Sequence, residues 1–407
     1  MKKYLILTIL IINLSYVLIA QNRLAVIDNL TYSSNYDTGY DDRTGISIKE
    51  IENGFITLAE TFYGKGIIAK HDYDGKIIWE KHFNNERINN ISVYDNYIYA
   101  IGYEYLKRKA WISKIDSDGS IVWEKLIRFQ FENEAEAISI SENGDIFIIC
   151  EIQRAWLPIK IRLKKSMYKR ISFRSLQKDI LENQIGIVKI DTAGRSKWKK
   201  TLGRQKNYNH YYAGTLSANN SEFVAQLYFT EYKKEQKNQG TRLIVLDKNG
   251  KIKKTINNQN QMSEVIKQED NEFLTFENNH NNRLDTPDTI TISKIIENKL
   301  VPQKKYISNF NTFTITSQLT DAQNSFYLGG YVCNFKTLGT IWSHHNDIYI
   351  AKFDSEFNLQ KEYQFNQESI DQINDMIMIE NRIYAIGESW YKENDKIKIR
   401  MRLIILK

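Results

Sequence analysis

Two turns in the sequence bring carboxylates close together, and carboxylate oxygens are ligands that Ca²⁺ prefers. They are Asp72–Asp74 and Asp116–Asp118, each part of a D-x-D-G stretch. A calcium loop of the EF-hand kind needs further oxygen ligands and a distal Glu within about 12 residues, and neither turn has them. An Asp that opens a turn also accepts hydrogen bonds from the backbone of that turn. The spacing therefore predicts turn chemistry at both places.

The pair His344–His345 is the other group of the metal-ligand type. Adjacent residues of a strand face opposite sides, so a shared metal ion would require a loop conformation and a third ligand, for which His280 is the candidate. The sequence has no G-x-S-x-G, H-E-x-x-H or phosphate-loop motif, and no recognisable pair of catalytic acids. We therefore predict no catalytic residue, no metal site and no cofactor.

A basic segment between Gln153 and Asn183 holds nine Lys or Arg residues and two acidic residues, with apolar side chains interleaved. Such a basic, amphipathic segment suits an anionic surface, either lipid headgroups or an acidic partner. The alternative is a long solvated loop whose charge is surface decoration. The candidate binding residues of this segment are Trp156, Lys160, Arg162, Lys164, Lys165, Lys169 and Arg170.

A second group of candidate binding residues is aromatic or imidazole-bearing and lies between strand-like runs. Its members are Tyr103, Tyr105, Tyr232, His280, Trp342, His344, Trp390 and Tyr391. Aromatic and polar side chains gathered on loops suit the recognition of peptides or glycans. The alternative is ordinary loop composition in a chain that contains 25 Tyr.

The elements that must position these residues are repeated hairpins. Three segments share one pattern: IIAKHDYDGKIIWEKHF from Ile67, WISKIDSDGSIVWEKLI from Trp111 and IVKIDTAGRSKWKKTL from Ile187. Each is an alternating apolar strand, an Asp/Gly turn and a second strand, which is a β-hairpin signature. Weaker copies start at Arg242, Ile290 and Asp347, and a half-copy, MRLIILK, ends at Lys407.

Each hairpin follows another strand pair, so one repeat contains four strands. Seven repeats predict an all-β fold, a single seven-bladed β-propeller of four-stranded antiparallel blades. The half-copy lacks its outer strand, which the strand-like segment 23–30 can supply, and this pairing would close the ring. Six or eight blades would follow if a divergent copy, at Ile290 or at the terminus, has been misread. In this ring the candidate aromatic residues share one face.

Three tryptophans, Trp79, Trp123 and Trp198, each follow the Asp that opens a turn by the same spacing. We predict that they are structural and pack between neighbouring blades. The corresponding positions of blades 4 to 6 are Lys254, Gln303 and Lys361.

The spacing D-x-x-G-x-x-x-W at Asp72, Asp116 and Asp191 resembles the tryptophan-docking repeat of pyrroloquinoline-quinone-type propellers. That family includes eight-bladed quinoprotein dehydrogenases, which hold a quinone beside a vicinal disulfide and a calcium ion, and non-catalytic envelope scaffolds. The chain has two cysteines, Cys150 and Cys333, which are not adjacent and which we predict to be buried free thiols three blades apart. The chain is thus similar to quinoprotein-like or WD40-like scaffolds, and its composition resembles secreted propellers of Bacteroidota.

The N-terminal sequence is typical of an export signal. Lys2 and Lys3 precede an apolar run from Tyr4 to Ala20, which predicts a signal peptide over residues 1–20, cleaved after Ala20. The alternative is a retained N-terminal anchor, for which this run is short. Gln21 follows the predicted cleavage site, so there is no Cys there for a bacterial lipid anchor. We expect a periplasmic or extracellular protein.

With a formal net charge of +7, 42% hydrophobic and 26% charged residues, the chain is typical neither of disordered nor of polytopic membrane proteins. We expect residues 21–407 to form the propeller, with the basic insertion at 153–183 in blade 3.

The predicted function is that of an exported, monomeric, non-catalytic scaffold for an envelope or extracellular protein or glycan. The alternatives are a propeller enzyme (a quinoprotein-like oxidoreductase, or a glycan lyase or hydrolase) and a structural envelope protein peripheral to anionic lipid. Nucleic acid is not an expected partner.

Overall fold

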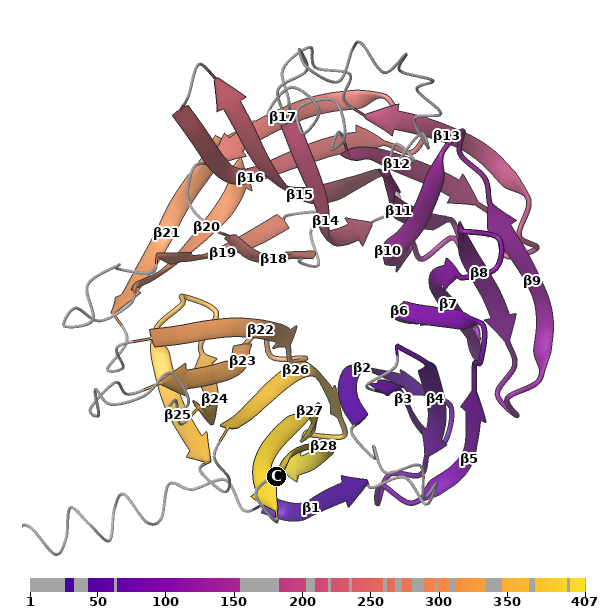
Figure 1. Cartoon of the computed structure of the whole chain (residues 1–407). Coiled ribbons are helices and arrows are strands. Elements are labelled where there is room, and N and C mark those ends of the chain that lie inside the picture. Colours follow the sequence, from indigo (N-terminus) through magenta and orange to yellow (C-terminus); the bar gives the residue numbers. More distant parts are fainter. Residues whose placement is uncertain are drawn as a thin grey trace, which may run out of the picture.

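The computed structural model describes residues 26–32, 43–61, 64–153, 183–202, 209–218, 221–233, 236–258, 262–267, 273–279, 289–296, 299–307, 312–333, 346–365, 370–393 and 396–406. Within these ranges every regular element is a β-strand, numbered β1 to β28 (Figure 1). In this part of the chain no helix has the length and apolarity that crossing a membrane demands. The predicted signal peptide, residues 1–20, lies outside the described residues.

Blades 1 to 4 follow one another in chain order. Their strands are β2 (Arg43–Ile51), β3 (Gly54–Thr61), β4 (Gly66–His71) and β5 (Ile77–His82); β6 (Glu86–Tyr94), β7 (Tyr97–Glu104), β8 (Lys109–Ile115) and β9 (Ile121–Ile127); β10 (Glu132–Ile140), β11 (Ile146–Gln153), β12 (Asn183–Ile190) and β13 (Ser196–Leu202); and β14 (Asn209–Ala218), β15 (Glu222–Lys233), β16 (Gln236–Asp247) and β17 (Ile252–Asn258).

Blades 5 to 7 complete the ring. Their strands are β18 (Met262–Lys267), β19 (Phe273–Asn279), β20 (Thr289–Ile296) and β21 (Lys299–Ile307); β22 (Thr312–Thr320), β23 (Phe326–Cys333), β24 (Asn346–Phe353) and β25 (Leu359–Phe365); and β26 (Ile370–Ile379), β27 (Arg382–Glu393), β28 (Lys396–Leu406) and β1 (Val26–Tyr32). A single parallel pair, Asn346 with Ile370, joins the sheets of blades 6 and 7.

The seven-bladed propeller is confirmed, and so is its closure by the N-terminal strand. The first strand of each blade lies nearest the ring axis (Figure 1). The outer strand of blade 7 is β1, which pairs antiparallel with β28 from Val26–Leu406 to Tyr32–Met401. The inner side of the junction is tied by Asp375 on β26, whose Oδ2 accepts hydrogen bonds from Ser47 Oγ (2.7 Å) and Lys49 Nζ (2.6 Å) on blade 1. Pairing between chain segments far apart in sequence therefore closes the ring.

The Asp/Gly turns cap themselves. Asp72 Oδ1 accepts hydrogen bonds from the backbone N–H groups of Asp74 (3.1 Å) and Lys76 (2.8 Å), and Gly75 has a φ of +85°. The same two bonds recur at the turns opened by Asp116, Asp191, Asp247 and Asp354. The backbone of each turn thus uses the carboxylate that the sequence could have offered to calcium.

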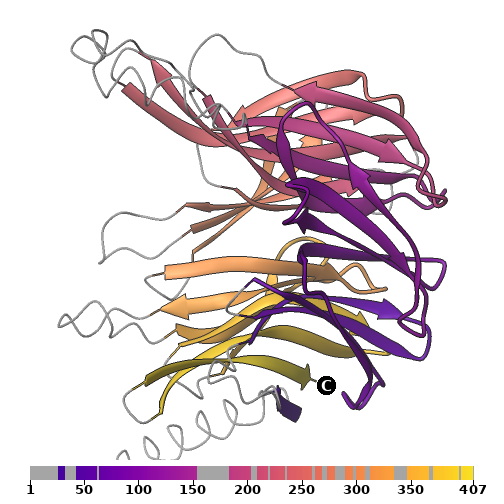
Figure 2. The same ribbon diagram turned by 45° about the vertical axis from the view of Figure 1, so that its right-hand side comes forward.

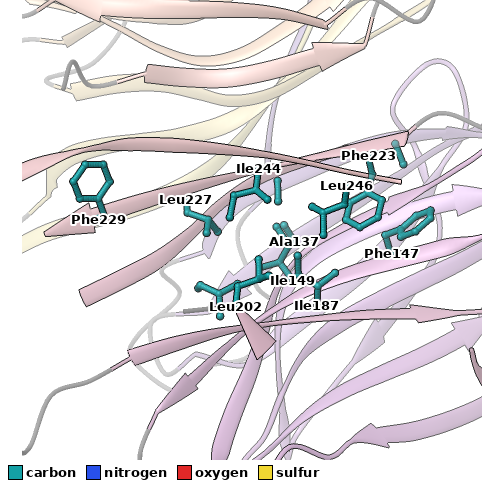
Figure 3. Packing of buried hydrophobic residues seen from close by; sticks show 13 residues of the cluster. Ala137, Phe147, Ile149, Ile187, Leu202, Phe223, Leu227, Phe229, Ile244 and Leu246 are labelled. Carbon is teal, nitrogen blue, oxygen red and sulfur yellow. The ribbon is translucent and has the colours of Figure 1, made fainter. Parts of the chain in front are cut away.

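The hydrophobic core lies between the blades. Figure 3 shows the cluster between blades 3 and 4, where Phe147 stacks on Phe223 with ring centroids 4.4 Å apart. Ile149 and Ile187 of blade 3 and Leu246 of blade 4 are buried in the same cluster. Strands β3 and β4 are buried over near-continuous runs, because both faces of each sheet are covered by its neighbours.

The three repeat tryptophans bridge adjacent blades. The Nε1–H groups of Trp79, Trp123 and Trp198 donate to the carbonyl oxygens of Ser117 (2.9 Å), Thr192 (3.3 Å) and Lys248 (3.1 Å), each in a turn of the next blade. The prediction that Gln303 takes this position in blade 5 is wrong. Lys294 there pairs with Val301, because only two residues separate β20 from β21 and the register shifts at Ile292/Ser293.

The inner strands of blades 1 to 7 each carry a register shift, and in blades 2, 6 and 7 the shifted residue also links two blades. We call these residues the bulge residues. Asn89 Nδ2 of blade 2 donates to the carbonyl oxygen of Ala135 in blade 3 (2.9 Å). Asn374 Nδ2 of blade 7 donates to that of Gly45 in blade 1 (2.7 Å), and Thr316 Oγ1 of blade 6 donates to that of Ile373 in blade 7. In blade 2 the second strand needs a glycine beside the bulge, since a Cβ on Gly102 would lie 1.9 Å from the Arg87 carbonyl oxygen.

Cys150 occupies the corresponding position in blade 3, opposite Ala135. Its thiol is free and fully buried, and burial raises its pKa well above the usual range, as expected for a small apolar residue. Cys333 lies on β23, three blades away, and its side chain is outside the described residues.

Candidate binding face

The second strand of each blade ends, and the third begins, on one face of the ring, which we call the loop face. Tyr103 lies near the end of β7, Tyr105 follows β7, Tyr232 lies near the end of β15, and Trp390 and Tyr391 lie toward the end of β27. In Figure 2 the pink β15–β16 hairpin and the yellow β27–β28 hairpin both extend to the left, on this face. The fold therefore places these predicted residues on the same side of the ring.

The β7–β8 turn presents two exposed apolar groups on this face. Tyr105 is 43% exposed and Leu106 is 74% exposed. The buried Glu104 carboxylate fixes the turn, because it accepts hydrogen bonds from the backbone N–H groups of Leu106 (3.1 Å) and Lys107 (2.5 Å). Arg108 completes the turn with a φ of +55°. A rigid turn thus holds Tyr105 and Leu106 in solvent.

Tyr103 anchors this turn to blade 3. Its hydroxyl donates to Glu132 Oε1 (2.5 Å), and Arg108 donates to Glu132 Oε2. Its ring packs edge-on against Tyr105, with centroids 5.4 Å apart. Burial and the Glu132 carboxylate raise the pKa of Tyr103 to about 12, so this hydroxyl stays protonated. Burial alone would raise the pKa of Glu132, but the hydrogen bonds from Tyr103 and Arg108 hold it below its usual value.

Arg87, on the inner strand of blade 2, connects three blades. Its Nε lies 3.2 Å from Glu60 Oε1 of blade 1, and its Nη1 lies 3.4 Å from Glu134 Oε1 of blade 3. Burial raises the pKa of Glu60 although Arg87 opposes this effect. One guanidinium is thus shared between two carboxylates beside the exposed turn.

Three carboxyl groups of blade 3, Glu134, Glu136 and Glu151, lie beyond Arg87, and we call them the carboxylate cluster. Asn89 Nδ2 lies within hydrogen-bond distance of Glu134 Oε1 (2.8 Å) and Glu136 Oε2 (3.2 Å). Burial, followed by the charges of Glu134 and Glu151, raises the pKa of Glu136 to about 8. Burial also raises the pKa of Glu151, although its Oε1 accepts a hydrogen bond from the Ala213 N–H (2.9 Å). The cluster holds more carboxyl groups than cations, and Glu136 keeps its proton at neutral pH.

Trp390 belongs to a separate network on blade 7. Its Nε1–H donates to Glu388 Oε1 (2.9 Å), which also accepts from Gln372 Nε2 (2.7 Å). These contacts stay within blade 7, whereas Tyr103 and Tyr105 contact blades 1 and 3. The loop face therefore carries two distinct polar groups.

Other predicted site residues cannot be placed in the same way. The backbones of Tyr232 and Tyr391 pair with Lys237 and Lys398, but the side chains of these tyrosines are outside the described residues. The residues His280, Trp342, His344, Trp156, Lys160, Arg162, Lys164, Lys165, Lys169 and Arg170 also lie outside the described residues. The last pair of β11 and β12 is Gln153 with Asn183, so segment 154–182 joins the second and third strands of blade 3.

The sequence prediction missed Arg87, Glu60, Asn89 and the carboxylate cluster. One signal was available, the alternation Glu132, Glu134, Glu136 at the start of a strand, which indicates one polar side. No sequence pattern indicated Arg87 and Glu60, because they meet across two blades. Among the described residues, no group of three or more His, Cys, Asp or Glu could hold a metal ion. The described part of the loop face therefore offers a ligand hydrogen-bonding groups, charged side chains and the aromatic surface of Tyr105.

No protein-family model matches the chain, and its sequence matches no curated protein. Solved structures that resemble it include the WD40 domain of Neurospora crassa Pan2 and Kuenenia stuttgartiensis hydrazine synthase. Both give a TM-score of 0.52 at 10% identity; they cover 94% and 90% of this chain, and 95% and 98% of those chains. A Bacteroides caccae protein of unknown function covers 79% of this chain and 93% of its own, at 10% identity and a TM-score of 0.41. At such identities the likeness shows the fold alone: the chain is a β-propeller protein.

Proposed function

We propose that the protein is an exported, non-catalytic scaffold that binds a protein or glycan of the envelope or extracellular space through its loop face. The main support is the β7–β8 turn, where Tyr105 and Leu106 are exposed on a backbone that Glu104 fixes. Exposed aromatic and aliphatic side chains on a rigid support are typical of binding hot spots, because little conformational entropy is lost on binding. We extend the proposal to the basic insertion 153–183 as a second docking element, on the strength of its charge and interleaved apolar residues in the sequence.

The proposal of export is supported by the sequence alone, through Lys2, Lys3 and the apolar run that ends at Ala20. The contacts of Trp79, Trp123 and Trp198 with the next blade support a relationship to tryptophan-docking propellers of the quinoprotein type. We extend to this chain only their use as secreted scaffolds, including those of Bacteroidota.

The test compares three forms of the mature protein. One replaces residues 154–182 by a short Gly-Ser linker and keeps the Gln153–Asn183 pair; another carries Tyr105→Ala and Leu106→Ser. The third, a matched control, is Ile78→Ser, since Ile78 is 55% exposed on the outer strand β5. Affinity capture from detergent-solubilised envelopes and a glycan array identify the partner, and titration with the purified partner gives the Kd.

We expect the Tyr105/Leu106 variant to bind the purified partner at least about tenfold more weakly, because truncating a hot-spot side chain costs about 1–2 kcal/mol or more. The linker variant should also lose affinity, and Ile78→Ser should bind like wild type. Equal Kd values for all forms would refute the loop face as the binding surface. Co-sedimentation of wild type, but not of the linker variant, with anionic vesicles would favour the lipid-peripheral alternative.

A further inference from the structure

The inner strands are joined by a repeated hydrogen bond, and one junction has an acid in the donor position. The bulge residues Asn89, Thr316 and Asn374 donate to the carbonyl of the residue that precedes the bulge in the next blade. In blade 3 the bulge residue is Glu136, between Ala135 and Ala137. The corresponding carbonyl in blade 4 belongs to Ala213, the last residue before the register shift of β14.

The protonation state of Glu136 decides whether it can act like Asn89, Thr316 and Asn374. A neutral carboxylic acid has one O–H donor, whereas a carboxylate only accepts. The geometry is compatible with the neutral form, because Asn89 Nδ2 donates to Oε2 and leaves the other oxygen to carry the proton.

The surroundings disfavour the ionised form. Glu134 lies on the same strand and Glu151 on β11, and Arg87 of β6 is already shared with Glu60. Burial and the two neighbouring carboxylates raise the pKa of Glu136 to about 8.

Other elements packed on β10 add little positive charge next to Glu136. On β7, Tyr103 is bonded to Glu132 and Glu104 caps its own turn, while on β8 the Lys109 ammonium donates to the carbonyls of Phe129 and Phe131. From Ala213 to Ala218 the side chains of β14 include no titratable group, and His210 lies in the part of β14 whose side chains are not described.

We propose that Glu136 is a proton-operated latch between blades 3 and 4, closed when its neutral carboxyl group donates to blade 4 and released when it ionises. As the pH rises, the proton leaves to solvent and a carboxylate remains buried beside Glu134 and Glu151. The junction loosens but does not separate, because Ala213 N–H is bonded to Glu151 and Ala218 N–H to Ser139 Oγ (3.1 Å).

The test compares wild type with Glu136→Gln, whose amide donates at every pH. Thermal unfolding and hydrogen–deuterium exchange of peptides covering 209–218 are measured from about pH 5.5 to about pH 9, with exchange corrected for its intrinsic pH dependence. In wild type the unfolding midpoint should fall by several degrees, and exchange at 209–218 should accelerate about tenfold or more, because one pH unit of differential proton binding is a factor of about ten. In Glu136→Gln the exchange at 209–218 should stay nearly constant, and the unfolding midpoint should fall less with rising pH than it does in wild type.

Glu124→Gln is the matched control, since Glu124 is exposed on the outer strand β9, and it should keep the wild-type pH dependence. Glu134→Gln removes one like charge and should move the transition to lower pH, which tests the latch even if Glu136→Gln does not fold. Parallel curves for wild type and Glu136→Gln would overturn the proposal. So would a pH dependence that His210→Gln abolishes and Glu136→Gln retains.

Discussion

His71 is a histidine that the fold holds neutral. Its ring is fully buried and stacks on Phe55, with centroids 5.0 Å apart. Nδ1 lies 3.0 Å from the Gly75 carbonyl oxygen, so Nδ1 carries the proton, and Nε2 accepts from Thr57 Oγ1 (2.9 Å). Burial lowers the pKa of His71, although the bond to Gly75 opposes this effect. The neutral imidazole of His71 therefore stabilises the Asp72 turn through its hydrogen bond to the Gly75 carbonyl oxygen.

We expect stability to depend on pH through His71. The unfolded chain takes up a proton near pH 6.5, about the ordinary pKa of His, whereas the folded chain does so only at lower pH. Between these two values the unfolded state binds more protons at this histidine, so His71 lowers the free energy of unfolding as the pH falls, by up to about 1.4 kcal/mol per pH unit, opposite in sign to the contribution of Glu136. Urea unfolding of wild type and His71→Gln from about pH 7.5 to about pH 5 measures the difference.

His71→Gln should unfold more easily at neutral pH, by about 1–3 kcal/mol, because a buried, stacked ring is lost. Its free energy of unfolding, relative to that of wild type, should nevertheless increase as the pH is lowered. His82→Gln is the control, since His82 lies on the adjacent strand β5 with an exposed side chain. Identical acid slopes for wild type and His71→Gln would show that another group titrates.

At the residue scale, the sequence predicted binding residues that can be chosen by their type and their place between strands. It missed residues whose properties depend on contacts with other strands. Tyr103 and Tyr105 could be chosen because they are aromatic residues near the junction of two strand-like runs. Glu136 could not, since its unusual protonation depends on Glu134, Glu151 and burial, and the last two require knowledge of the strand pairing. The one-residue shift at Glu136 also has no marker in a single sequence.

At the element scale, the outer hairpin of each of the first three blades is anchored by its tryptophan. Trp198 is stacked on Phe223, with centroids 5.9 Å apart, and donates to the Lys248 carbonyl. Gly250 keeps room for this ring, because a Cβ there would lie 2.9 Å from it. The hydrogen bond and the packing are separable contributions.

Two substitutions at Trp198 should separate them. Trp198→Phe removes the N–H donor and should lower the free energy of unfolding by about 0.5–1.5 kcal/mol. Trp198→Ala also removes packing between blades 3 and 4 and should lower it by about 2–4 kcal/mol. Denaturant titration measures both, and Ile78→Ala, at a 55% exposed position, should change stability by less than about 0.5 kcal/mol. A smaller loss for Ala than for Phe would contradict this division.

The elements were largely predictable because hairpins are local. Alternation, the Asp turn and its glycine are all contained in some fifteen residues, as the segment from Ile67 shows. Blade 5 was placed less well: its turn is shorter, so counting from the turn selected Gln303 where the register places Val301 opposite Lys294. The links made by Asn89 and Asn374 could not be predicted, because they join different blades.

At the scale of the whole molecule, two ties join blade 7 to the start of the chain. On the outside β1 pairs with β28, and on the inside Asp375 binds Ser47 and Lys49 of blade 1. Asp375 Oδ1 also accepts from Ser317 Oγ of blade 6 (3.2 Å), so one carboxylate connects three blades. These contacts hold the first and last blades together and so keep the ring closed.

Removing β1 should open the ring. A chain that starts after Tyr32 leaves the edge of β28 unpaired, with the buried Leu403, Ile405 and Leu406 behind it, and exposed edges promote association. We expect a lower unfolding midpoint and dimers or aggregates by size-exclusion chromatography with light scattering.

A chain that starts at Arg23 keeps β1 and is the matched control. A synthetic peptide spanning residues 23–32 should restore the midpoint of the shorter chain in a concentration-dependent way, because binding to the folded state stabilises it. Equal midpoints and a monomeric short chain would exclude β1 as the closing element.

The β1–β28 pairing also sets an order of events in time. Tyr32 and Met401 are partners, so the ring cannot close until synthesis has passed β28, whereas each inner hairpin can form as soon as its few residues are available. A chain interrupted anywhere before β28 leaves β1 and one blade face without partners, and such exposed segments are what proteases and chaperones recognise. We therefore expect chains that lack β28 to be degraded faster than chains in which β1 and β28 are paired.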